Sequence, residues 1–335
     1  MQTITDLLVT NSFVCLIALD FSKAFDTVRH DTLLNKMALL NIPDAIYNWL
    51  VDFFQDHEHC TKYGMSTSQM LQVSASIIQG SAIGPVSYDI NASDLSTVTL
   101  GNLMYKYADD TYLVIPTSNV QSRETELNHV AEWAQKNNLK LNREKSVEII
   151  FRDRKRKQQF SDPPTLPNIQ RDTQIKILGV TITNHLSVSE HVRDVIGKCG
   201  QTMYVLKVLR SHGLNDAALK DIYKAVVLAK LLYASPAWWG YATASDRHRI
   251  EAFVRRGVRL QLYGAGDPTP TQLAEDADET LFCRITRNQY HVLHRFLPEL
   301  NCHQHNLRPR RHNFSLSVKT DDRNFIIRQL FSNSY

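Results

Sequence analysis

Two adjacent acids interrupt an apolar run near residue 110. Asp109 and Asp110 lie inside "YKYADDTYLVI", which occupies residues 105–115. Neighbouring carboxylates repel each other and raise each other's pKa. A divalent cation removes that repulsion, and Mg²⁺ completes its shell with phosphate oxygens and water. The pair therefore indicates a metal site for phosphate chemistry, although adjacent Asp residues also form ordinary solvated turns.

A third acid ends a separate apolar segment. Asp20 lies in "SFVCLIALDFS" (12–22), whose short run of branched and aromatic residues predicts a buried strand. The segment 102–116 predicts a strand, a tight turn and a second strand. If the two segments pair, Asp20 lies beside the acidic turn. Three acids from two strands can then hold two metal ions about 3.5–4 Å apart, as in-line phosphoryl displacement requires.

The rest of the pattern predicts strands with interleaved helices, then helices alone. Helices are expected within 31–55 (with Pro43 starting a second piece), 84–95, 122–138, 189–211, 216–233, 245–261 and 280–296. Strands are expected at 146–151 and 175–182, a hairpin around Gly64 from 59–63 and 70–78, and a long turn at 161–168. This order predicts helices packed on a sheet, followed by an all-helical part.

Charge divides the chain into an acidic and a basic half. Residues 1–150 carry 10 Lys/Arg and 17 Asp/Glu, a net of −7, whereas residues 151–335 carry 28 and 17, a net of +11. This asymmetry fits a metal site beside a polyanion-binding surface, and equally an ordinary fluctuation in surface charge.

Cysteine usage and hydropathy argue against a disulfide-linked, zinc-binding, secreted or membrane-spanning protein. None of the five cysteines forms a CxxC pair, which predicts reduced thiols, and "CHQH" at 302–305 lacks a partner cluster with zinc spacing. The apolar run 13–19 follows no basic region, so no secretory signal is expected. No stretch approaches the length of a membrane span, and no membrane partner is predicted.

Five short segments occur in an order that resembles the palm motifs of reverse transcriptases. They are "ALDFSKAFDTVRH" (18–30), "IIQGSAIGP" (77–85), "YADD" (107–110), "LKLNREKS" (139–146) and "ILGV" (177–180). Their form is similar to the enzymes of non-LTR (LINE-type) retrotransposons rather than retroviral ones. The resemblance covers 12–182 and continues more loosely through 234–260.

This resemblance implies an α+β fold. A right-hand polymerase palm, an antiparallel sheet with packed helices, is expected over residues 1–183. A helical thumb-like region would follow at 184–262, and a C-terminal helical extension at 263–335. The fingers segments that normally precede the first catalytic strand are expected to be missing, and no endonuclease, RNase H or Cys–His knuckle pattern is visible.

The resemblance also implies roles for individual residues. Asp20 and Asp109 match the metal-binding acids, and Asp110 matches a less direct third acid. The implied cofactor is Mg²⁺, as two ions, with Mn²⁺ as an alternative. Residues 177–180 match the turn that supports the primer end.

Five further residues match the family's substrate contacts. Tyr107 would lie near the primer 3′ end. Phe25 matches the side chain that stacks under the sugar and judges its 2′ position. Gln79 and Gly80 match the segment that touches the incoming nucleotide and the template. Lys145 matches a lysine proposed to protonate the pyrophosphate leaving group.

Plainer interpretations stay open for several of these side chains. Phe25 equally suits an ordinary core position, and Lys145 a solvated charge on a strand edge. Gln79 before a Gly-Ser turn could simply satisfy backbone groups. Asp89, in a helix expected to pack on the sheet, would be costly if buried but could also face solvent.

Two helical segments carry charged residues of uncertain role. Asp26, Arg29 and His30 most simply cap and solvate the helix that begins near residue 31. The helix 245–261 has an apolar stripe and a basic face, formed by Ile250, Phe253, Val254 and Val258 and by Arg249, Arg255, Arg256 and Arg259. The basic face suits a primer–template backbone, and equally a solvated surface.

The predicted function is RNA-directed DNA polymerisation: addition of dNTPs to a DNA primer on an RNA template. The alternative is a truncated, inactive retrotransposon relic that at most binds nucleic acid. A third class, a metal-dependent phosphatase or another nucleotidyl transferase, would share the acids without needing Phe25 or residues 79–85. An intracellular, nuclear location is inferred from the family.

Overall fold

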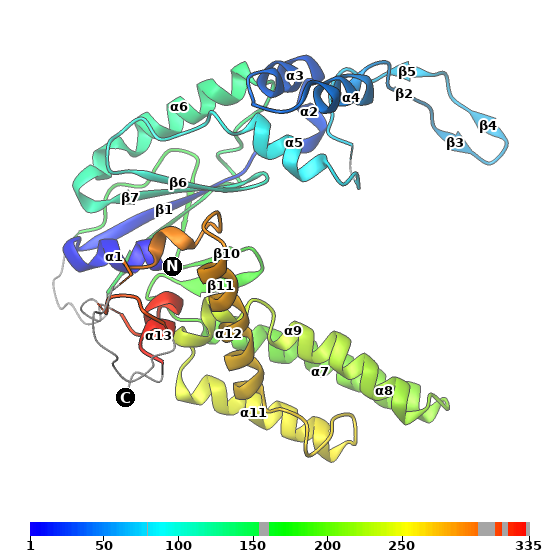
Figure 1. Ribbon diagram of the computed structural model, residues 1–335, viewed down its shortest axis with the longest axis vertical. Helices are drawn as coiled ribbons and strands as arrows, with labels where there is room; N and C mark the ends of the chain where they lie inside the picture. The colour runs from blue at the N-terminus through cyan, green and yellow to red at the C-terminus, as the bar shows by residue number, and fades with distance from the viewer. Residues whose placement is uncertain (79, 154–160, 301–311, 317–320, 333–335) are drawn as a thin grey trace. The chain divides into compact units, whose positions relative to one another are not determined.

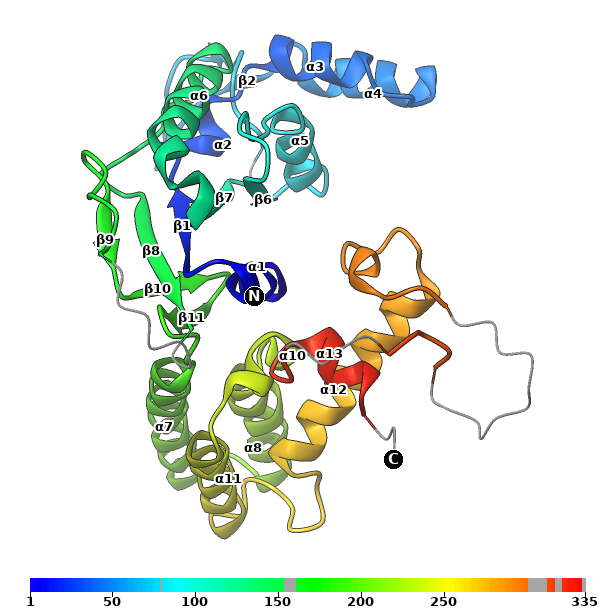
Figure 2. The ribbon, with the colours of Figure 1, turned by 90° about the vertical axis from the view of Figure 1, so that its left-hand side faces the viewer.

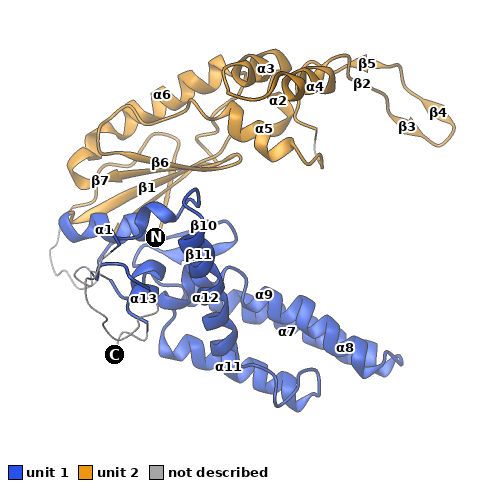
Figure 3. Cartoon of the chain, in the orientation of Figure 1, with its two compact units in different colours: residues 1–10, 152–154, 174–335 blue, residues 11–151, 155–173 orange. Residues whose placement is uncertain are grey.

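The computed structural model describes residues 1–78, 80–153, 161–300, 312–316 and 321–332. They form two compact units, coloured separately in Figure 3. Residues 11–151 and 155–173 are called the sheet unit, and residues 1–10, 152–154 and 174–335 the helical unit. The expected α+β architecture, with a sheet followed by helices, is confirmed. The three-part domain division stays a prediction.

The sheet unit alternates strands and helices along the chain (Figure 1). Its helices are α2 (Ala24–Thr27), α3 (His30–Ala38), α4 (Asp44–Phe54), α5 (Gly84–Asn91), the 3₁₀ turn η1 (Thr117–Ser122) and α6 (Arg123–Lys136). Its strands are β1 (Phe13–Leu19), β2 (Glu58–His59), β3 (Lys62–Tyr63), β4 (Ser66–Thr67), β5 (Leu71–Gln72), β6 (Leu103–Tyr107), β7 (Asp110–Pro116), β8 (Val147–Arg152) and β9 (Gln170–Asp172).

Five strands form the main sheet in the order β6-β7-β1-β8-β9, with β1 in the centre (Figure 2). β7 pairs antiparallel with both β6 and β1, whereas β8 and β9 pair parallel, so the expected antiparallel sheet is in fact mixed. Six of the seven β1 side chains are buried, as expected for an apolar run without alternation. The predicted buried strand at 12–22 and the strand–turn–strand at 102–116 are confirmed.

One face of the sheet is covered by helices. Side chains of β1 and β7 share a core cluster with side chains from α3, α4, α5 and α6. On α6, Leu127, Val130 and Ala134 are buried as predicted, whereas Ala131 is only half-buried and Trp133 joins the buried set. α5 ends at Asn91, earlier than the predicted Leu95, although Leu95 itself is buried.

The prediction that His30 helps to solvate a helix start is wrong. His30 is 7 % exposed, and its two ring nitrogens lie 3.0 Å and 2.8 Å from the carbonyl oxygens of Phe54 and Ser76. Carbonyl oxygens only accept hydrogen bonds, so both nitrogens donate when the ring is protonated. His30 therefore joins three segments of the sheet unit. Asp89, in contrast, is exposed on α5.

A thin ribbon projects between α4 and α5. β2 pairs with β5, β3 pairs with β4, and Gly64 and Met65 form the connection at the tip. Every side chain from 58 to 72 is exposed, including Tyr63 at 88 %. The predicted hairpin around Gly64 is confirmed, but its returning arm lies at 66–72 rather than 70–78.

The helical unit combines one small hairpin with a set of helices. Its elements are α1 (Gln2–Thr10), β10 (Gln174–Ile177), β11 (Val180–Thr183), α7 (Ser189–Ser211), α8 (Asp216–Ile222), the π-helical η2 (Tyr223–Leu228), α9 (Ala229–Leu231), α10 (Ser235–Trp238), the 3₁₀ turns η3 (Trp239–Tyr241) and η4 (His294–Phe296), α11 (Ala244–Arg259), α12 (Pro270–Arg287) and α13 (Phe325–Leu330). The hairpin at 175–182 and the helix at 189–211 are confirmed.

The helix predicted at 280–296 is misplaced. α12 begins at Pro270, where Thr269 and Gln272 form a capping box, and ends at Arg287. The helix α1 is not predicted at all. No helix among the described residues combines the length and apolarity that crossing a bilayer requires. Four cysteines, Cys15, Cys60, Cys199 and Cys283, are free, and the "CHQH" segment lies outside the described residues.

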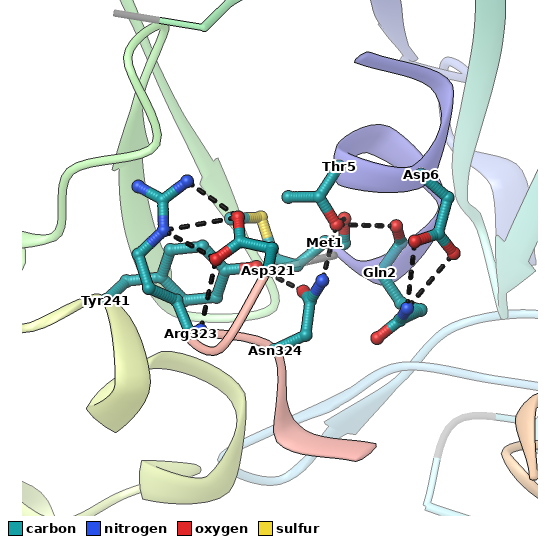
Figure 4. Close-up of polar contacts among 8 residues, drawn as sticks. All are labelled: Met1, Gln2, Thr5, Asp6, Tyr241, Asp321, Arg323 and Asn324. Atoms are coloured by element: carbon teal, nitrogen blue, oxygen red, sulfur yellow. Dashed lines mark hydrogen bonds and ion pairs between the residues drawn. The ribbon is translucent and has the colours of Figure 1, made fainter. Parts of the chain in front are cut away.

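Buried polar groups join three distant segments of the helical unit (Figure 4). The Asn324 amide donates to Thr5 Oγ1 at 2.6 Å, and the Tyr241 hydroxyl donates to Asn324 Oδ1. All three side chains are at most 6 % exposed. Arg323 pairs with Asp321 at 2.7 Å and lies over the Tyr241 ring. The start of α1, the turn η3 and the approach to α13 are therefore tied together.

Gly240 lets the segment before α13 pack closely against the turn η3. A Cβ atom at this position would lie 2.0 Å from the Arg323 carbonyl oxygen, and backbone cannot move aside cheaply. We expect Gly240→Ala to lower the free energy of unfolding by roughly 1–3 kcal/mol, through overpacking. Gly197→Ala is the matched control, because Gly197 lies inside α7 with nothing within 4 Å of its Cβ position. There, alanine should stabilise the helix by roughly 0.5–1 kcal/mol. Equal urea midpoints for the two variants would contradict the packing.

A buried carboxylate holds the Pro-rich turn against the sheet. Glu148 on β8 is 1 % exposed and pairs with Arg123 and Arg171, each at 2.6 Å. The guanidinium groups of both arginines also donate to the Pro164 carbonyl oxygen, at 3.1 Å. The two arginines that pair with Glu148 therefore also hold the turn predicted at 161–168.

Removing the Glu148 charge should leave two cations without their counter-ion. We expect Glu148→Gln to destabilise the protein by about 3 kcal/mol, the lower part of the range for breaking a buried pair, because Gln keeps one acceptor. Glu124→Gln on α6 is the control, because its 2.8 Å pair with Arg143 is partly exposed and should change stability by less than about 1 kcal/mol. Similar shifts in the two urea midpoints would refute the clamp.

Candidate active site

Asp20 follows the last residue of the central strand, and its backbone is held on both sides. Its N–H donates to Ser146 Oγ at 3.1 Å, and its carbonyl oxygen accepts from the Asn142 N–H at 2.8 Å. Ser146 is fully buried and donates in turn to the Asn142 carbonyl oxygen at 2.7 Å. The segment 139–146 thus fixes the backbone position of Asp20.

Asp109 and Asp110 lie at the tip of the neighbouring hairpin. Tyr107 pairs with Asp110, so Ala108 and Asp109 form a two-residue connection between β6 and β7. Ala108 has a φ of 50°, in the left-handed region that such tight connections use. Tyr107, Asp109 and Asp110 are exposed at this end of the sheet.

The strand register brings the three acids together. Leu19 pairs with Thr111, so the next step along the antiparallel pair sets Asp20 opposite Asp110. Partial desolvation, and then the charges of Asp109 and Asp20, raise the pKa of Asp110 above its ordinary value. The charges of Asp109 and Asp20 thus influence Asp110, whereas a metal pocket shared by the three carboxylates stays a prediction.

This donor set suits a hard divalent cation. Three carboxylates supply oxygen ligands, and a cation would offset both the partial desolvation and the neighbouring charges that raise the Asp110 pKa. Among the described residues, no group of three or more His, Cys, Asp or Glu side chains is already arranged to hold a metal ion. The fit therefore rests on the chemistry of the carboxylates and on their mutual influence.

Phe25 lies on the short helix α2, five residues after Asp20. Its carbonyl oxygen accepts from the Ile77 N–H at 2.7 Å, which ties the first motif to the segment that contains Gly80. The half-buried Phe25 ring stacks on Tyr88 of α5, with centroids 5.0 Å apart and planes 28° from parallel. Phe25 thus borders the core without being enclosed by it.

The other predicted substrate contacts lie in turns. Gly80 has a φ of 84°, a conformation that favours glycine, and open space around its Cα. Gln79 lies outside the described residues. Lys145 is exposed in the turn before β8, not on a strand edge, and directly precedes the Ser146 that bonds Asp20.

Two lysines that the sequence analysis did not single out position α5. Lys106 on β6 donates to the Leu95 carbonyl oxygen at 2.8 Å and also to that of Ala92, and Lys36 on α3 donates to the Asn91 carbonyl oxygen. Cations at a helix C-terminus complement its dipole. Burial lowers the pKa of Lys106. The only sequence signal is that Lys106 interrupts an apolar strand.

A hollow of about 590 Å³ lies beside α3, α4 and the base of the ribbon. Its lining includes His30, Phe54 and His57 and none of the three acids. The predicted metal-binding acids therefore do not line this cavity.

Two predicted features belong to the helical unit. Leu178 and Gly179 form the turn between β10 and β11, with φ values of 44° and 89°, and the Tyr233 hydroxyl donates to the Leu178 carbonyl oxygen at 3.3 Å. On α11, Ile250, Phe253 and Val254 are buried as predicted. The four arginines, Arg249, Arg255, Arg256 and Arg259, are exposed. Their contact with a nucleic acid stays a prediction.

A mixed sheet with helices packed on one face, and acidic residues at the ends of paired strands, defines an α+β protein. The chain belongs to the reverse transcriptase (RNA-dependent DNA polymerase) family, whose model matches residues 5–182. The match spans all three acids and the segment from Phe25 to Gly80.

Curated relatives come from mobile elements. The chain is 28% identical over 256 residues to a probable RNA-directed DNA polymerase from transposon BS of Drosophila melanogaster, covering 72% of this chain and 28% of that protein. It is 25% identical over 333 residues to the RNA-directed DNA polymerase from mobile element jockey of the same species, covering 93% and 35%. The chain thus spans about a third of these relatives' length.

Solved structures show a weaker likeness. The telomerase of Candida tropicalis, solved in complex with a fragment of telomeric RNA, matches with a TM-score of 0.44 and 12% identity, over 87% of this chain and 50% of that one. The same telomerase without RNA matches with a TM-score of 0.42. At these scores the likeness adds nothing to the family assignment.

Repulsion at the acid cluster has a testable pH dependence. Because the pKa of Asp110 is raised in the folded chain, the folded state binds its proton more tightly than the unfolded state, whose Asp pKa is about 3.9. The free-energy cost of the Asp110 charge in the folded state is therefore present at neutral pH and is lost as the pH falls through the folded-state pKa of Asp110. Asp110→Asn should raise the urea midpoint at pH 7, and this gain should shrink towards pH 4.

Glu132→Gln serves as the control for that titration, because Glu132 is an exposed acid on α6 of the same unit. The change in urea midpoint that Glu132→Gln causes should not vary with pH in the same way. A loss of stability in Asp110→Asn at pH 7, or a gain independent of pH, would show that the folded chain does not disfavour the charge of Asp110.

Proposed function

We propose that this chain extends a DNA primer on an RNA template by adding deoxynucleotides to the primer 3′-hydroxyl. The observation that supports the proposal is the position of Asp20, Asp109 and Asp110 at the ends of paired strands, with Asp110 under the influence of the other two charges. The chain spans about a third of the length of its curated relatives. The activity of those longer proteins is therefore a proposal for this chain.

Asp20 and Asp109 would hold two Mg²⁺ ions, with Mn²⁺ as the alternative and Asp110 as a supporting ligand. When bound, such ions make a hydroxyl more nucleophilic and neutralise a triphosphate. The protein contributes positioning: Ser146 and Asn142 fix the Asp20 backbone, and the tight turn between β6 and β7 carries Asp109. Preorganised charge of this kind is the main catalytic resource for phosphoryl transfer.

The remaining family positions would receive the substrates. Tyr107, exposed beside the acidic turn, would lie near the primer 3′ end. Phe25 would stack under the incoming sugar and exclude a 2′-hydroxyl by bulk. Gln79 and Gly80 would touch the nucleotide and the template, and Lys145 would donate a proton or positive charge to the leaving pyrophosphate.

A second candidate function is nucleic-acid binding without catalysis. The specific observation in its favour is the exposed basic face of α11, which needs none of the three acids. Arginines on a helix can follow a phosphate backbone without reading sequence. This is the reading in which the chain is a relic of a mobile element.

Primer extension separates the alternatives. A labelled DNA primer on an RNA template, with dNTPs and Mg²⁺, should lengthen, and Asp109→Ala should lower the rate at least about 100-fold, because a charge-stabilising group at the reacting atoms is lost. Asp89→Asn is the matched control, since Asp89 is an exposed acid of the same unit on α5. Extension that survives Asp109→Ala would overturn the proposal.

Two further results would redirect the assignment. Duplex binding without extension, weakened by replacing Arg249, Arg255, Arg256 and Arg259 and steeply dependent on salt, would support the binding function. Release of phosphate or pyrophosphate without a template would instead support a phosphatase or another nucleotidyl transferase.

A further inference from the structure

A buried hydroxyl joins the segments 18–30 and 139–146, which lie far apart along the chain. Ser146 is fully buried, and its Oγ atom accepts a hydrogen bond from the Asp20 N–H at 3.1 Å. The same hydroxyl donates to the Asn142 carbonyl oxygen at 2.7 Å. A hydroxyl has a single proton to donate, so these two bonds fix its orientation. Ser146 is therefore held between the end of β1 and the turn that precedes β8.

Further backbone contacts join the same two segments. The Ser22 N–H donates to the Lys140 carbonyl oxygen at 2.9 Å. Phe21 and Leu141 form an isolated antiparallel bridge. The two backbones are thus held together directly after Asp20, and the hydroxyl of Ser146 is one member of a continuous set of contacts.

The turn that carries Lys145 is anchored on its other side by α6. Arg143 pairs with Glu124 at 2.8 Å and donates to Asn128 Oδ1 at 2.9 Å. The Lys145 N–H donates to Asn142 Oδ1 at 3.3 Å, and Lys145 itself is exposed. The lysine therefore lies on the surface of a turn that is bound both to α6 and to the end of β1.

We propose that Ser146 is a positioning residue that holds Asp20 and Lys145 in one fixed relation. Asp20 is the predicted metal ligand and Lys145 the predicted donor to the leaving pyrophosphate, so the inference rests on the proposed function. Both groups would act in a single phosphoryl transfer, whose rate depends on their relative geometry. One buried hydroxyl would set that geometry, because Ser146 binds the backbone of Asp20 and directly follows Lys145 in the chain.

Ser146→Ala removes the hydroxyl without adding bulk. It should weaken Mn²⁺ binding about tenfold, the lower end of the range for losing an outer partner of a metal ligand, measured by the spin resonance of free Mn²⁺ without any turnover. It should also lower kcat for primer extension about tenfold and leave the KM for dNTP within about twofold, because a small displacement of reacting groups slows the chemical step.

A double variant tests the link to Lys145. If Ser146 acts partly by placing that lysine, replacing Ser146 costs less once the lysine is gone. In a Lys145→Ala background, Ser146→Ala should therefore lower kcat by about threefold instead of about tenfold. The same loss of kcat in both backgrounds would overturn the fixed relation between the two groups.

Ser87→Ala is the matched control within the sheet unit. Ser87 is also buried, at 1 % exposed, but its hydroxyl donates within α5, to the Ile83 carbonyl oxygen at 2.9 Å. Its removal should leave Mn²⁺ affinity, kcat and KM at the wild-type values. Thermal unfolding reports whether each variant is folded. If Ser146→Ala unfolds, Ser146→Cys takes its place, and the same loss of Mn²⁺ affinity is expected because a thiol is a weak donor and acceptor.

The outcomes separate this inference from the proposed function. If wild type binds Mn²⁺ and extends a primer, but the Ser146 variant keeps the wild-type Mn²⁺ affinity or the wild-type kcat, the role of Ser146 is overturned alone. If wild type extends no primer, the proposed function and this inference fall together.

Discussion

The structure depends on holding like charges together. Asp20, Asp109 and Asp110 repel one another, and the rest of the sheet unit supplies the constraint that keeps them near. The register between β1 and β7 sets Asp20 opposite Asp110, and a slip of one residue would turn every side chain of the strand to the opposite face. Side chains on both faces of β1 are buried, so such a slip would misfit the packing on both sides of the strand. The bonds from Ser146 and Asn142 add a second constraint, which acts on the backbone of Asp20 itself.

Much of the fold could be predicted because it follows from local patterns. The central strand is a short apolar run ended by an acid, the acidic hairpin has its turn residues in place, and the helix at 189–211 keeps its period over its whole length. Where the prediction fails, distant contacts or an overlooked cap decide. The helix predicted at 280–296 begins instead at Pro270, where the capping box of Thr269 and Gln272 was the available signal. His30 is polar and near a helix start, yet carbonyl oxygens from two other segments enclose it.

The candidate site divides in the same way. Its acids could be proposed from the sequence because they lie at the ends of two strands that pair, and the family match includes them. The functional roles of Phe25, Gln79, Gly80, Tyr107 and Lys145 stay predictions. Tyr88 could not be singled out beforehand, since an aromatic residue on one face of a helix most simply fills the core. Only its stacking on Phe25 distinguishes it, and this contact joins segments more than sixty residues apart along the chain.

The exposed ribbon at 58–72 has a different consequence. Because none of its side chains is buried, lengthening or shortening it leaves the core unchanged. Insertions and deletions among related chains should therefore concentrate at the Gly64–Met65 tip. The motifs at 18–30 and 77–85, on either side of the ribbon, should keep their lengths, because they are packed into the sheet unit. The same tip is a place where a fluorescent label or an affinity peptide can be inserted with little disturbance to the carboxylates.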